Sequence, residues 1–310
     1  MGEFLRYVQR NPSLGWGLGI LLLLLLFSTV GRIFVNKDDA YALATIPDLP
    51  PTLDSEYLDK MGEVQGFQAK LEQLRLAMRP TFGTDSQGKG LLASLVYGTG
   101  MTLQIGAIAG IIGIGIGTIL GFVSGYYAGS LFDNIVTSIV DVVLTMPGFL
   151  ILILIASSLA DPDELEVAQM GLIVSVTSWA FPTRAIRSQV MSMRERPFVM
   201  MAKLSGMSGP EIILKELMPN LLPYLVMSLA QSVYGGVMGS LGLQGLGIGD
   251  RRQPWLGMTI YWLNYYAAFL RGMWWWILEP VGVIILLLTS LTLISFGLDE
   301  VANPRVRRRV

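Results

Sequence analysis

The sequence contains no cysteine and no histidine among its 310 residues. It can therefore form no disulfide, offer no thiolate or imidazole to a metal ion, and supply no cysteine nucleophile or histidine general base. Charged side chains are also scarce, at 15% of the chain, where soluble domains carry about 25%. An enzyme with this sequence would have to use carboxylates, lysine, serine or tyrosine.

Apolar residues take the place of the missing charges. They make up 52% of the chain, and the mean hydropathy is +0.56. The formal net charge is −1, so no overall field favours nucleic acid or an acidic substrate. The composition indicates a protein of the lipid bilayer rather than a soluble domain.

Long apolar stretches predict how often the chain crosses the bilayer, since a helix needs about 20 mostly apolar residues to span the hydrocarbon. The third stretch contains Pro147, where we expect a bend or a break, and the fourth is short because Pro182 follows it. We predict an all-α membrane protein with six transmembrane helices. The predicted spans are 14–35, 101–124, 135–160, 167–181, 221–245 and 274–296.

The first stretch also has features of a secretory signal. Arg6 and Arg10 precede it, and the triplet Ala-Leu-Ala at 42–44 resembles a cleavage site. The triplet lies well beyond the last apolar turn, however, and the charged residues at 37–39 intervene. We therefore predict an uncleaved membrane anchor.

Arginine positions predict the orientation. Four arginines lie at 184–196 and four more in the final six residues, close to span ends, whereas residues 161–166 hold four acids and no base. The positive-inside rule places the arginine-rich segments in the cytoplasm, and an even number of spans puts both termini on that side. The predicted organisation is residues 1–35 as cytoplasmic N-terminus and first span, 36–90 as an extracytoplasmic segment, 91–300 as a five-helix core that includes the loop 184–220, and 301–310 as a basic cytoplasmic tail.

Residues 83–90 read GTDSQGKG and resemble the phosphate-binding pattern G-x-x-x-x-G-K-[ST]. The last position is Gly90, so the hydroxyl that would bind magnesium is missing, and no predicted strand precedes the segment. The orientation also places it outside, where ATP is absent. We interpret it as a turn that leads into the second span.

Glycines recur every four residues along the second span, from Gly106 to Gly110 and again from Gly113 to Gly125. Such small-x-x-x-small ridges allow helices to approach closely. Gly115 and Gly117 resemble part of a dinucleotide fingerprint, but no βαβ pattern surrounds them, so we predict helix packing. The glycines at 235–245 suggest that the fifth span is a second close-packed helix or is locally broken.

Two acidic residues lie within predicted spans, Asp141 and Glu279. Charged groups inside a membrane are candidates for function, so both could line a path, while a structural or interfacial role is the alternative. Nine aromatic residues at 255–276 predict an interfacial belt with a short helix or, alternatively, a stacking surface for a sugar or an aromatic side chain.

The polar segment 54–78 has apolar residues at three-to-four spacing, which predicts an amphipathic helix. This helix could cap the membrane-spanning part, contact an external partner or pack on the surface.

The loop after the fourth span, 194–225, alternates short helical stretches with Gly206, Gly209 and Pro210, and these stretches end near Pro219. Such a compact, initially basic unit is typical of a docking element for a soluble subunit. Gly206 lies where the loop must reverse, which favours positive φ or a close backbone approach.

This loop resembles the signature of the membrane subunits of binding-protein-dependent ABC importers, E-A-A-x-x-x-G followed by L-P about a dozen residues later. Met200, Met201 and Ala202 occupy the E-A-A positions, Gly206 the glycine position and residues 218–220 the L-P-N positions. The spacing matches, and Met200 replaces the glutamate.

Other motifs resemble the C-type permease of the oligopeptide/dipeptide/nickel class. Residues 83–89 are similar to the family's G-T-D-x-x-G-R, with Gly90 in place of the following Asp, and Leu95-Val96-Tyr97-Gly98 is similar to L-I-Y-G. The resemblance extends from about 82 to 305. Further matching positions are 255–258, Trp275, Trp276, Pro280 and 303–305.

The resemblance implies a type I importer permease that works by alternating access. It implies a second, B-type permease subunit, two cytoplasmic ATPase subunits, an extracytoplasmic solute-binding protein and surrounding membrane lipid, with no nucleic acid. ATP and magnesium would be bound by the ATPase subunits, so this chain would have no catalytic, cofactor or metal site. The expected ATPase-coupling residues are Met200, Met201, Ala202, Gly206, Gly209 and Pro219.

Peptide is the first expectation for the solute, with oligosaccharide or nickel as alternatives within the same family. A membrane channel or a membrane-embedded enzyme is the competing class. An enzyme would need a carboxylate pair or a Ser/Lys arrangement at one depth, and a channel would need a symmetric pore motif. The sequence displays neither.

Overall fold

The computed structural model describes residues 11–51, 74, 81–158 and 165–302. In these segments the regular structure is helical, and the one β-type contact is an isolated bridge between Thr84 and Gly90. The predicted all-α fold is confirmed. The amphipathic helix predicted at 54–78 and the basic tail from 303 onward lie outside the described residues.

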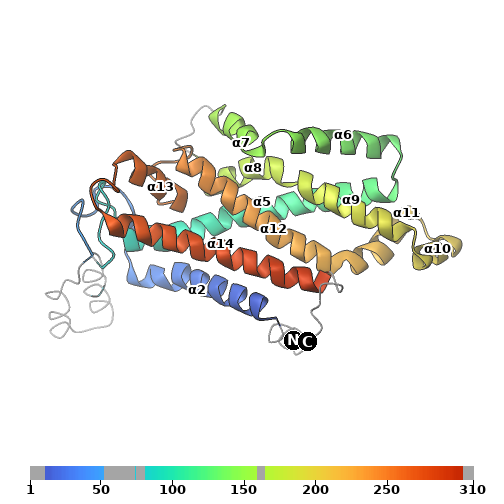
Figure 1. The fold of residues 1–310 in the computed structure, drawn as a ribbon, viewed down its shortest axis with the longest axis horizontal. Helices are drawn as coiled ribbons and strands as arrows, with labels where there is room; N and C mark the ends of the chain where they lie inside the picture. The colour runs from blue at the N-terminus through green and yellow to red at the C-terminus, as the bar shows by residue number, and fades with distance from the viewer. Residues whose placement is uncertain (1–10, 52–73, 75–80, 159–164, 303–310) are drawn as a thin grey trace.

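Among the described residues, four helices are long and apolar enough to cross a membrane. They are α2 (Pro12–Phe34), α5 (Leu91–Tyr126), α12 (Met218–Gly245) and α14 (Trp274–Ala302), and they lie lengthwise along the molecule in Figure 1. Helix α5 begins ten residues before the predicted second span. Its 36 residues correspond to a length of about 54 Å, so it extends beyond a hydrocarbon layer about 30 Å thick.

The third predicted span is bent, as Pro147 led us to expect. Helices α6 (Leu131–Thr145) and α7 (Gly148–Ser157) meet at an angle of 87°. Met146, between them, is extended with φ −75° and ψ 141°, because a following proline disfavours the helical conformation.

The fourth predicted span is divided at Trp179 into α8 (Val167–Ser178) and α9 (Ala180–Arg194). Length and apolarity support four spans among the described residues, or five when α6 and α7 count as one. The total of six stays a prediction, because α8 has only 12 residues.

Helix α5 is the centre of the bundle, and its glycines explain why. A Cβ on Gly110 would lie 2.8 Å from the backbone nitrogen of Val233 on α12, and a Cβ on Gly117 would lie 2.7 Å from Cβ of Pro182 on α9. Gly115, which faces away from the ridge, has no atom within 4 Å of such a Cβ. The predicted ridge is confirmed, and it allows α5 to contact α12 on one side and α8–α9 on the other.

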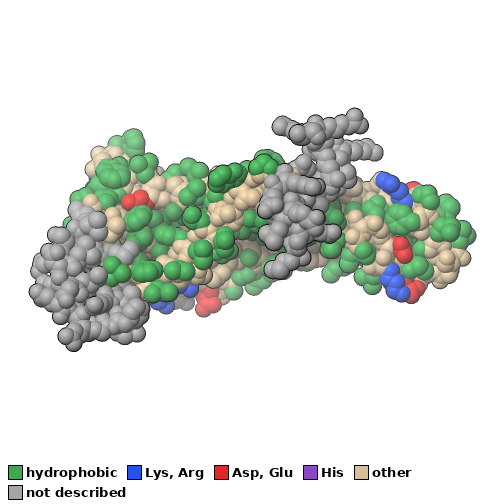
Figure 2. Space-filling view, turned by 90° about the horizontal axis from the view of Figure 1, so that it is seen from below, with side chains coloured by type: hydrophobic (Ala, Val, Ile, Leu, Met, Phe, Trp, Pro, Cys, Tyr) green, Lys and Arg blue, Asp and Glu red, His purple; other side chains and the backbone are tan. Residues whose placement is uncertain are grey.

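The two ends of the bundle carry different elements of the chain. Helix α2 begins and α14 ends toward the end that carries α10 and α11, while α13 (Leu256–Tyr265) and the loops around 36–51 and 81–90 lie at the opposite end. On the face in Figure 2, apolar side chains cover the middle of the described part and charged ones gather toward its ends. This distribution suits a bundle that crosses a bilayer.

The segment 83–90 is a turn, as predicted. Gly83 and Gly88 have φ of +73° and +74°, and the amides of Gln87 and Lys89 donate to Oδ1 of Asp85, each at 2.8 Å. These N–H groups point at the chain's own carboxylate rather than outward, so the segment cannot cradle a phosphate.

A second loop holds this turn in place. The Thr84 hydroxyl donates to the Ile46 carbonyl at 2.7 Å, and the Gly90 amide donates to the Asp39 carbonyl at 2.7 Å. The residues 36–51 and 81–90 together are called the loop cap below.

The aromatic segment contains the expected short helix, α13, but it is only partly an exposed belt. Trp255 and Trp276 are fully buried, whereas Tyr265, Phe269 and Trp274 are exposed. Trp276 packs against Leu91 at the start of α5. Part of the predicted belt is therefore core that attaches α13 to the bundle.

Candidate functional site

The loop with the importer signature forms a compact helical unit at one end of the molecule. Helix α9 leads through Glu195 and Arg196 into α10 (Pro197–Leu204), then α11 (Gly209–Ile212), a π-helical turn (Ile213–Leu217) and α12. Pro197 lies in the first turn of α10, where its missing N–H costs no helical hydrogen bond. The predicted alternation of short helices and turns is confirmed.

Gly206 ends α10 in the left-handed conformation, with φ of +82°. The Met207 amide donates to the Ala202 carbonyl at 3.1 Å, and the Gly206 amide donates to the Lys203 carbonyl at 3.0 Å. These two bonds define a Schellman motif, in which glycine is the favoured residue because it has no Cβ. A Cβ at this position would meet no other atom within 4 Å, so backbone conformation alone requires the glycine.

The six expected coupling residues divide into an exposed and a structural group. Met200 and Met201 are 61% and 65% exposed, whereas Ala202 packs into a core cluster with Val199 and Ile212. Leu204, which the motif did not indicate, is 80% exposed. It follows Met200 by four residues and Met201 by three, so helical spacing alone could have identified it. We call Met200, Met201 and Leu204 the α10 face.

Gly209 belongs to the structural group, whereas Pro219 is exposed. A Cβ on Gly209 would lie 2.3 Å from the Tyr127 hydroxyl, so this glycine allows α11 to approach the end of α5. Pro219 is exposed in the first turn of α12.

Glu211 caps α11 by accepting the Ser208 amide at 3.0 Å. Hydrogen bonds from the Ser208 amide and hydroxyl hold the pKa of Glu211 below its usual value, which favours the ionised cap.

The same end of α5 is tied to α9 as well as to the loop. Arg194 donates from Nη1 to the Tyr126 carbonyl at 3.2 Å, and the Lys203 ammonium lies 5.6 Å from the centre of the Tyr126 ring. A cation–π interaction of this kind stabilises by about 0.5–1 kcal/mol at exposed sites. Displacement of α10 would therefore act on α5 and α9 together.

A buried ion pair connects α6 to α9, and sequence reasoning missed it. Asp133 is only 2% exposed and accepts Arg187 Nε at 2.6 Å, Arg187 Nη2 at 2.8 Å and the Gly129 amide at 2.8 Å. Asp133 lies just before the predicted third span, so it did not count as an intramembrane charge. The bidentate geometry identifies it as a strong, oriented contact.

The two acids that sequence reasoning did single out are in different surroundings. Asp141 on α6 forms an ion pair with Arg184 on α9, and both side chains are more than half exposed. Glu279 on α14 is half-buried, and its Oε2 has no hydrogen-bond partner among the described residues. Neither lines the central pocket described next, so their place in a solute path stays a prediction.

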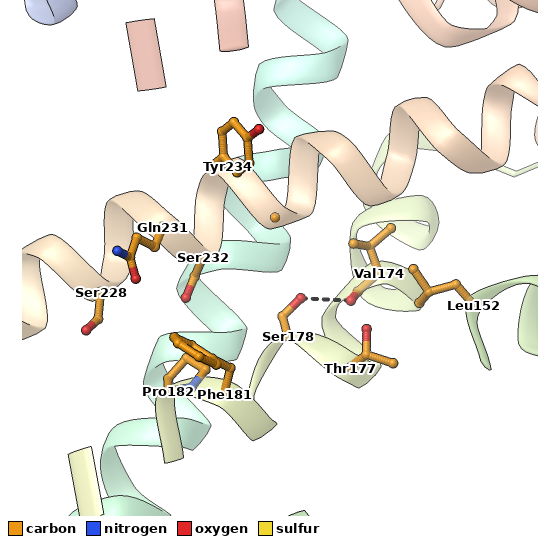
Figure 3. Close-up of a pocket in the computed structure, with 11 residues that line it drawn as sticks. Leu152, Val174, Thr177, Ser178, Phe181, Pro182, Ser228, Gln231, Ser232 and Tyr234 are labelled. Atoms are coloured by element: carbon orange, nitrogen blue, oxygen red, sulfur yellow. Dashed lines mark hydrogen bonds between the residues drawn. The ribbon is translucent and has the colours of Figure 1, made fainter. Parts of the chain in front are cut away.

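The central pocket is a cavity of about 410 Å³ between α12 and the α7–α8–α9 segment. Figure 3 shows Ser232 on α12 pointing toward the segment that carries Ser178 and Phe181. The lining residues of α12, from Ser228 to Gly235, lie at the middle of that 28-residue helix. The pocket therefore lies about halfway along the bundle.

The composition of this lining is neutral. Six hydroxyl or amide side chains alternate with apolar ones, and the lining contains no Asp, Glu, Lys or Arg. The polar residues are Thr177, Ser178, Ser228, Gln231, Ser232 and Tyr234.

Comparison with protein families matches residues 113–308 to the binding-protein-dependent transport system inner membrane component family. The chain belongs to this family. The match includes the signature loop at 194–225 and the central pocket, and it begins within α5.

Individual relatives of the chain are also named as transport permeases. Dipeptide transport system permease protein DppC of Bacillus subtilis is 25% identical over 303 residues, 98% of this chain and 85% of its own. DppC of Alkalihalophilus pseudofirmus is 31% identical over 229 residues, 73% of this chain and 72% of its own. Oligopeptide transport system permease protein OppC of Mycobacterium bovis is 27% identical over 259 residues, 84% and 85% respectively.

The chain is thus a multi-pass membrane protein with the type I importer permease fold and acts as a permease subunit of an ABC importer. Its relatives are permease components of transporters rather than enzymes. The resemblance noted from the coupling loop and the C-type motifs is confirmed at the level of the family.

Proposed function

We propose that this subunit forms half of the path of an ATP-driven peptide importer in the cytoplasmic membrane. It pairs with a B-type permease subunit, receives its solute from an extracytoplasmic binding protein, and is driven by two cytoplasmic ATPase subunits that bind ATP and magnesium. Both termini lie in the cytoplasm, with the α10 end. The names of the dipeptide and oligopeptide relatives favour peptide over oligosaccharide or nickel.

The exposed α10 face carries this proposal. Three large apolar side chains are exposed on one short helix at the end of the molecule, beyond the helices that are long enough to span a membrane. Burial of such a side chain in a partner's groove stabilises the complex by about 1.5–3 kcal/mol. Methionine suits this role because its flexible thioether adapts to the shape of a groove, and Met200 needs no carboxylate for it.

The contacts around the α10 face explain how movement of the ATPase subunits would reach the membrane-spanning helices. When ATP closes the ATPase pair, α10 moves with its groove. The Schellman turn at Gly206 and the contact of Gly209 with Tyr127 make α10, α11 and the end of α5 one unit. The Asp133–Arg187 pair extends this unit to α6, so the helices around the central pocket move relative to one another.

The test replaces the α10 face in the complete transporter. The triple variant Met200→Ser, Met201→Ser, Leu204→Ser should insert and pair with the partner permease but lose most ATPase subunits on purification and most stimulation by the loaded binding protein. Leu131→Ser is the matched control, because Leu131 is 76% exposed on α6 outside the loop. Normal ATPase recruitment by the triple variant would refute the proposed coupling.

The solute class has its own experiment. Proteoliposomes with the whole complex should accumulate alanine di- and tripeptides in an ATP-dependent manner, and maltotriose or Ni²⁺ should not compete. Competition by either one would favour the corresponding alternative.

A further inference from the structure

Hydroxyl groups in the helices of this bundle usually bond to their own backbone. On α14, Thr292 donates to the Leu288 carbonyl at 2.8 Å and Ser295 donates to the Leu291 carbonyl at 2.9 Å. On α12, Ser240 donates to the Val237 carbonyl at 2.9 Å. These side chains have satisfied their hydrogen-bonding capacity internally, as polar groups in an apolar bundle should.

Three polar side chains of the central pocket differ. Thr177, Gln231 and Ser232 form no side-chain hydrogen bond within the described residues, although each lines the cavity. By contrast, Ser178, in the same pocket, donates to the Val174 carbonyl at 2.8 Å (Figure 3). These two hydroxyls and one amide therefore remain available to a ligand.

Open space distinguishes these groups from other unpaired polar atoms. Ser94 and Thr102 on α5 also lack partners, but their oxygens are sealed in the core. Ser232, Thr177 and Gln231 instead border a cavity of about 410 Å³, within the range of about 300–1,000 Å³ that ligand pockets occupy. Gly235 borders the same cavity, and a Cβ there would meet nothing within 4 Å.

The chemistry of the lining restricts the ligand. Hydroxyl and primary amide groups both donate and accept hydrogen bonds, and the other lining side chains are apolar or aromatic. A free metal cation would find no carboxylate there, and the chain has no imidazole or thiolate. A neutral group with one donor and one acceptor, flanked by variable side chains, fits this surface. The amide of a peptide main chain is such a group.

We propose that Thr177, Gln231 and Ser232 form the solute-contacting site of this subunit, where they bind the main-chain amides of a passing peptide through neutral hydrogen bonds. The absence of charge in the lining allows peptides to pass whatever their side-chain charge. This inference rests on the proposed importer function and goes beyond it by naming the contact residues.

The first experiment removes the available hydroxyls. Thr177→Val and Ser232→Ala are combined in the reconstituted complex, and uptake of di- and tri-alanine is measured together with ATP hydrolysis. Uptake per ATP should fall several-fold, with binding-protein-stimulated ATPase activity retained. Thr292→Val with Ser295→Ala is the matched control, since Ser295 and Ser232 are each 8% exposed and both control hydroxyls are bonded internally. The control should transport normally.

The second experiment is independent of transport rate. Because the chain has no cysteine, Ser232→Cys introduces a single thiol in the pocket by a minimal change. A small polar maleimide should label it in the assembled complex, and tri-alanine with ATP and loaded binding protein should slow that labelling. Tri-lysine and tri-glutamate should protect to a similar extent.

The outcomes separate this inference from the importer proposal. If the α10 variants uncouple ATPase activity but the pocket variants transport normally and labelling ignores peptide, the importer proposal stands and this site is refuted. A thiol that is inaccessible in the complex would also refute it, because lipid or the partner subunit would then fill the pocket. Protection by tri-alanine but not by the charged peptides would overturn the claim of charge tolerance.

Discussion

At residue 206 a single backbone angle decides whether α10 can end where it does. An L side chain with positive φ is strained by about 1–3 kcal/mol, and the open space around Gly206 means that sterics add little more. We predict that Gly206→Val inserts and pairs with the partner permease yet uncouples or loses the ATPase subunits. Uptake and ATPase assays on the reconstituted complex measure this.

A control exists at the same position. Asparagine tolerates the left-handed conformation better than other residues with a side chain, so Gly206→Asn should retain most of the coupling. Normal transport by Gly206→Val would remove this turn from the mechanism.

The buried carboxyl of Asp85 predicts a pH dependence of stability. Burial raises the pKa of Asp85 to about 6, although a hydrogen bond from the Lys89 amide and the Lys89 charge act in the opposite direction. Burial also lowers the pKa of Lys89. Between pH 4 and pH 6 the folded cap thus keeps a proton that the unfolded chain has lost. Stability should fall by up to about 3 kcal/mol as pH rises through this window.

The measurement is the thermal unfolding midpoint of the purified permease from pH 4 to pH 7. Asp85→Asn should flatten the decline, since the amide oxygen can still accept the Gln87 and Lys89 amides. Asp48 is the matched control: burial raises its pKa, but hydrogen bonds from Ser86 and Arg271 lower it overall. The Asp48 charge is the smallest of the contributions to the raised pKa of Asp85, so Asp48→Asn should leave most of the decline in place.

At the scale of elements, the glycine ridge of α5 leads us to expect different effects of the same substitution at two glycines of this helix. Gly117→Val would force side-chain atoms into Pro182 and Thr183, and overpacking of this kind costs about 1–3 kcal/mol or more. Gly115→Val enters open space and should be neutral. Thermal stability and expression in the membrane compare the two variants, and equal behaviour would contradict the packing role of the ridge.

Two ion pairs join helices α6 and α9, and they differ in burial. Their contributions to stability should therefore differ and can be measured separately. Asp133 is buried but the Arg187 side chain is 25% exposed, so Asp133→Asn should cost more than loss of an exposed pair and less than the about 3–5 kcal/mol of a fully buried one. It should also reduce transport per ATP. Asp141→Asn breaks the exposed pair with Arg184 and should cost about 0–1 kcal/mol. Charge reversal at both Asp133 and Arg187 should restore part of the loss, whereas two equally mild single variants would exclude α6 from force transmission.

At the scale of the whole molecule, the proposed orientation can be tested because the chain has no cysteine. Leu43 in the loop cap and Leu204 on α10 are both highly exposed, and the segment 36–51 and helix α10 lie at opposite ends of the bundle (Figure 1). In intact cells, an impermeant maleimide should label Leu43→Cys, and it should label Leu204→Cys only after the membrane is opened. The reverse pattern would invert the topology and exclude α10 as the ATPase contact.

Local sequence patterns predicted much of the architecture, because helix length, bends and turns depend on residues that are close in the sequence. Apolar length predicted the long helices, Pro147 predicted the sharp bend between α6 and α7, and four-residue glycine spacing predicted the close contacts of α5. The signature spacing around Gly206 located the reversal of the loop between α10 and α11. Each of these properties depends on residues within a few turns of one another.

The tertiary structure decided what depends on distant partners. Met200 and Met201 point outward while Ala202 packs inward, because the loop folds back so that Ala202 meets Ile212 in one core cluster. The partner of Asp133 lies 54 positions away, and the central pocket joins α8–α9 to α12. Whether Thr177 and Ser232 bond to their own helix or remain available depends on rotamer and packing, which periodicity does not encode.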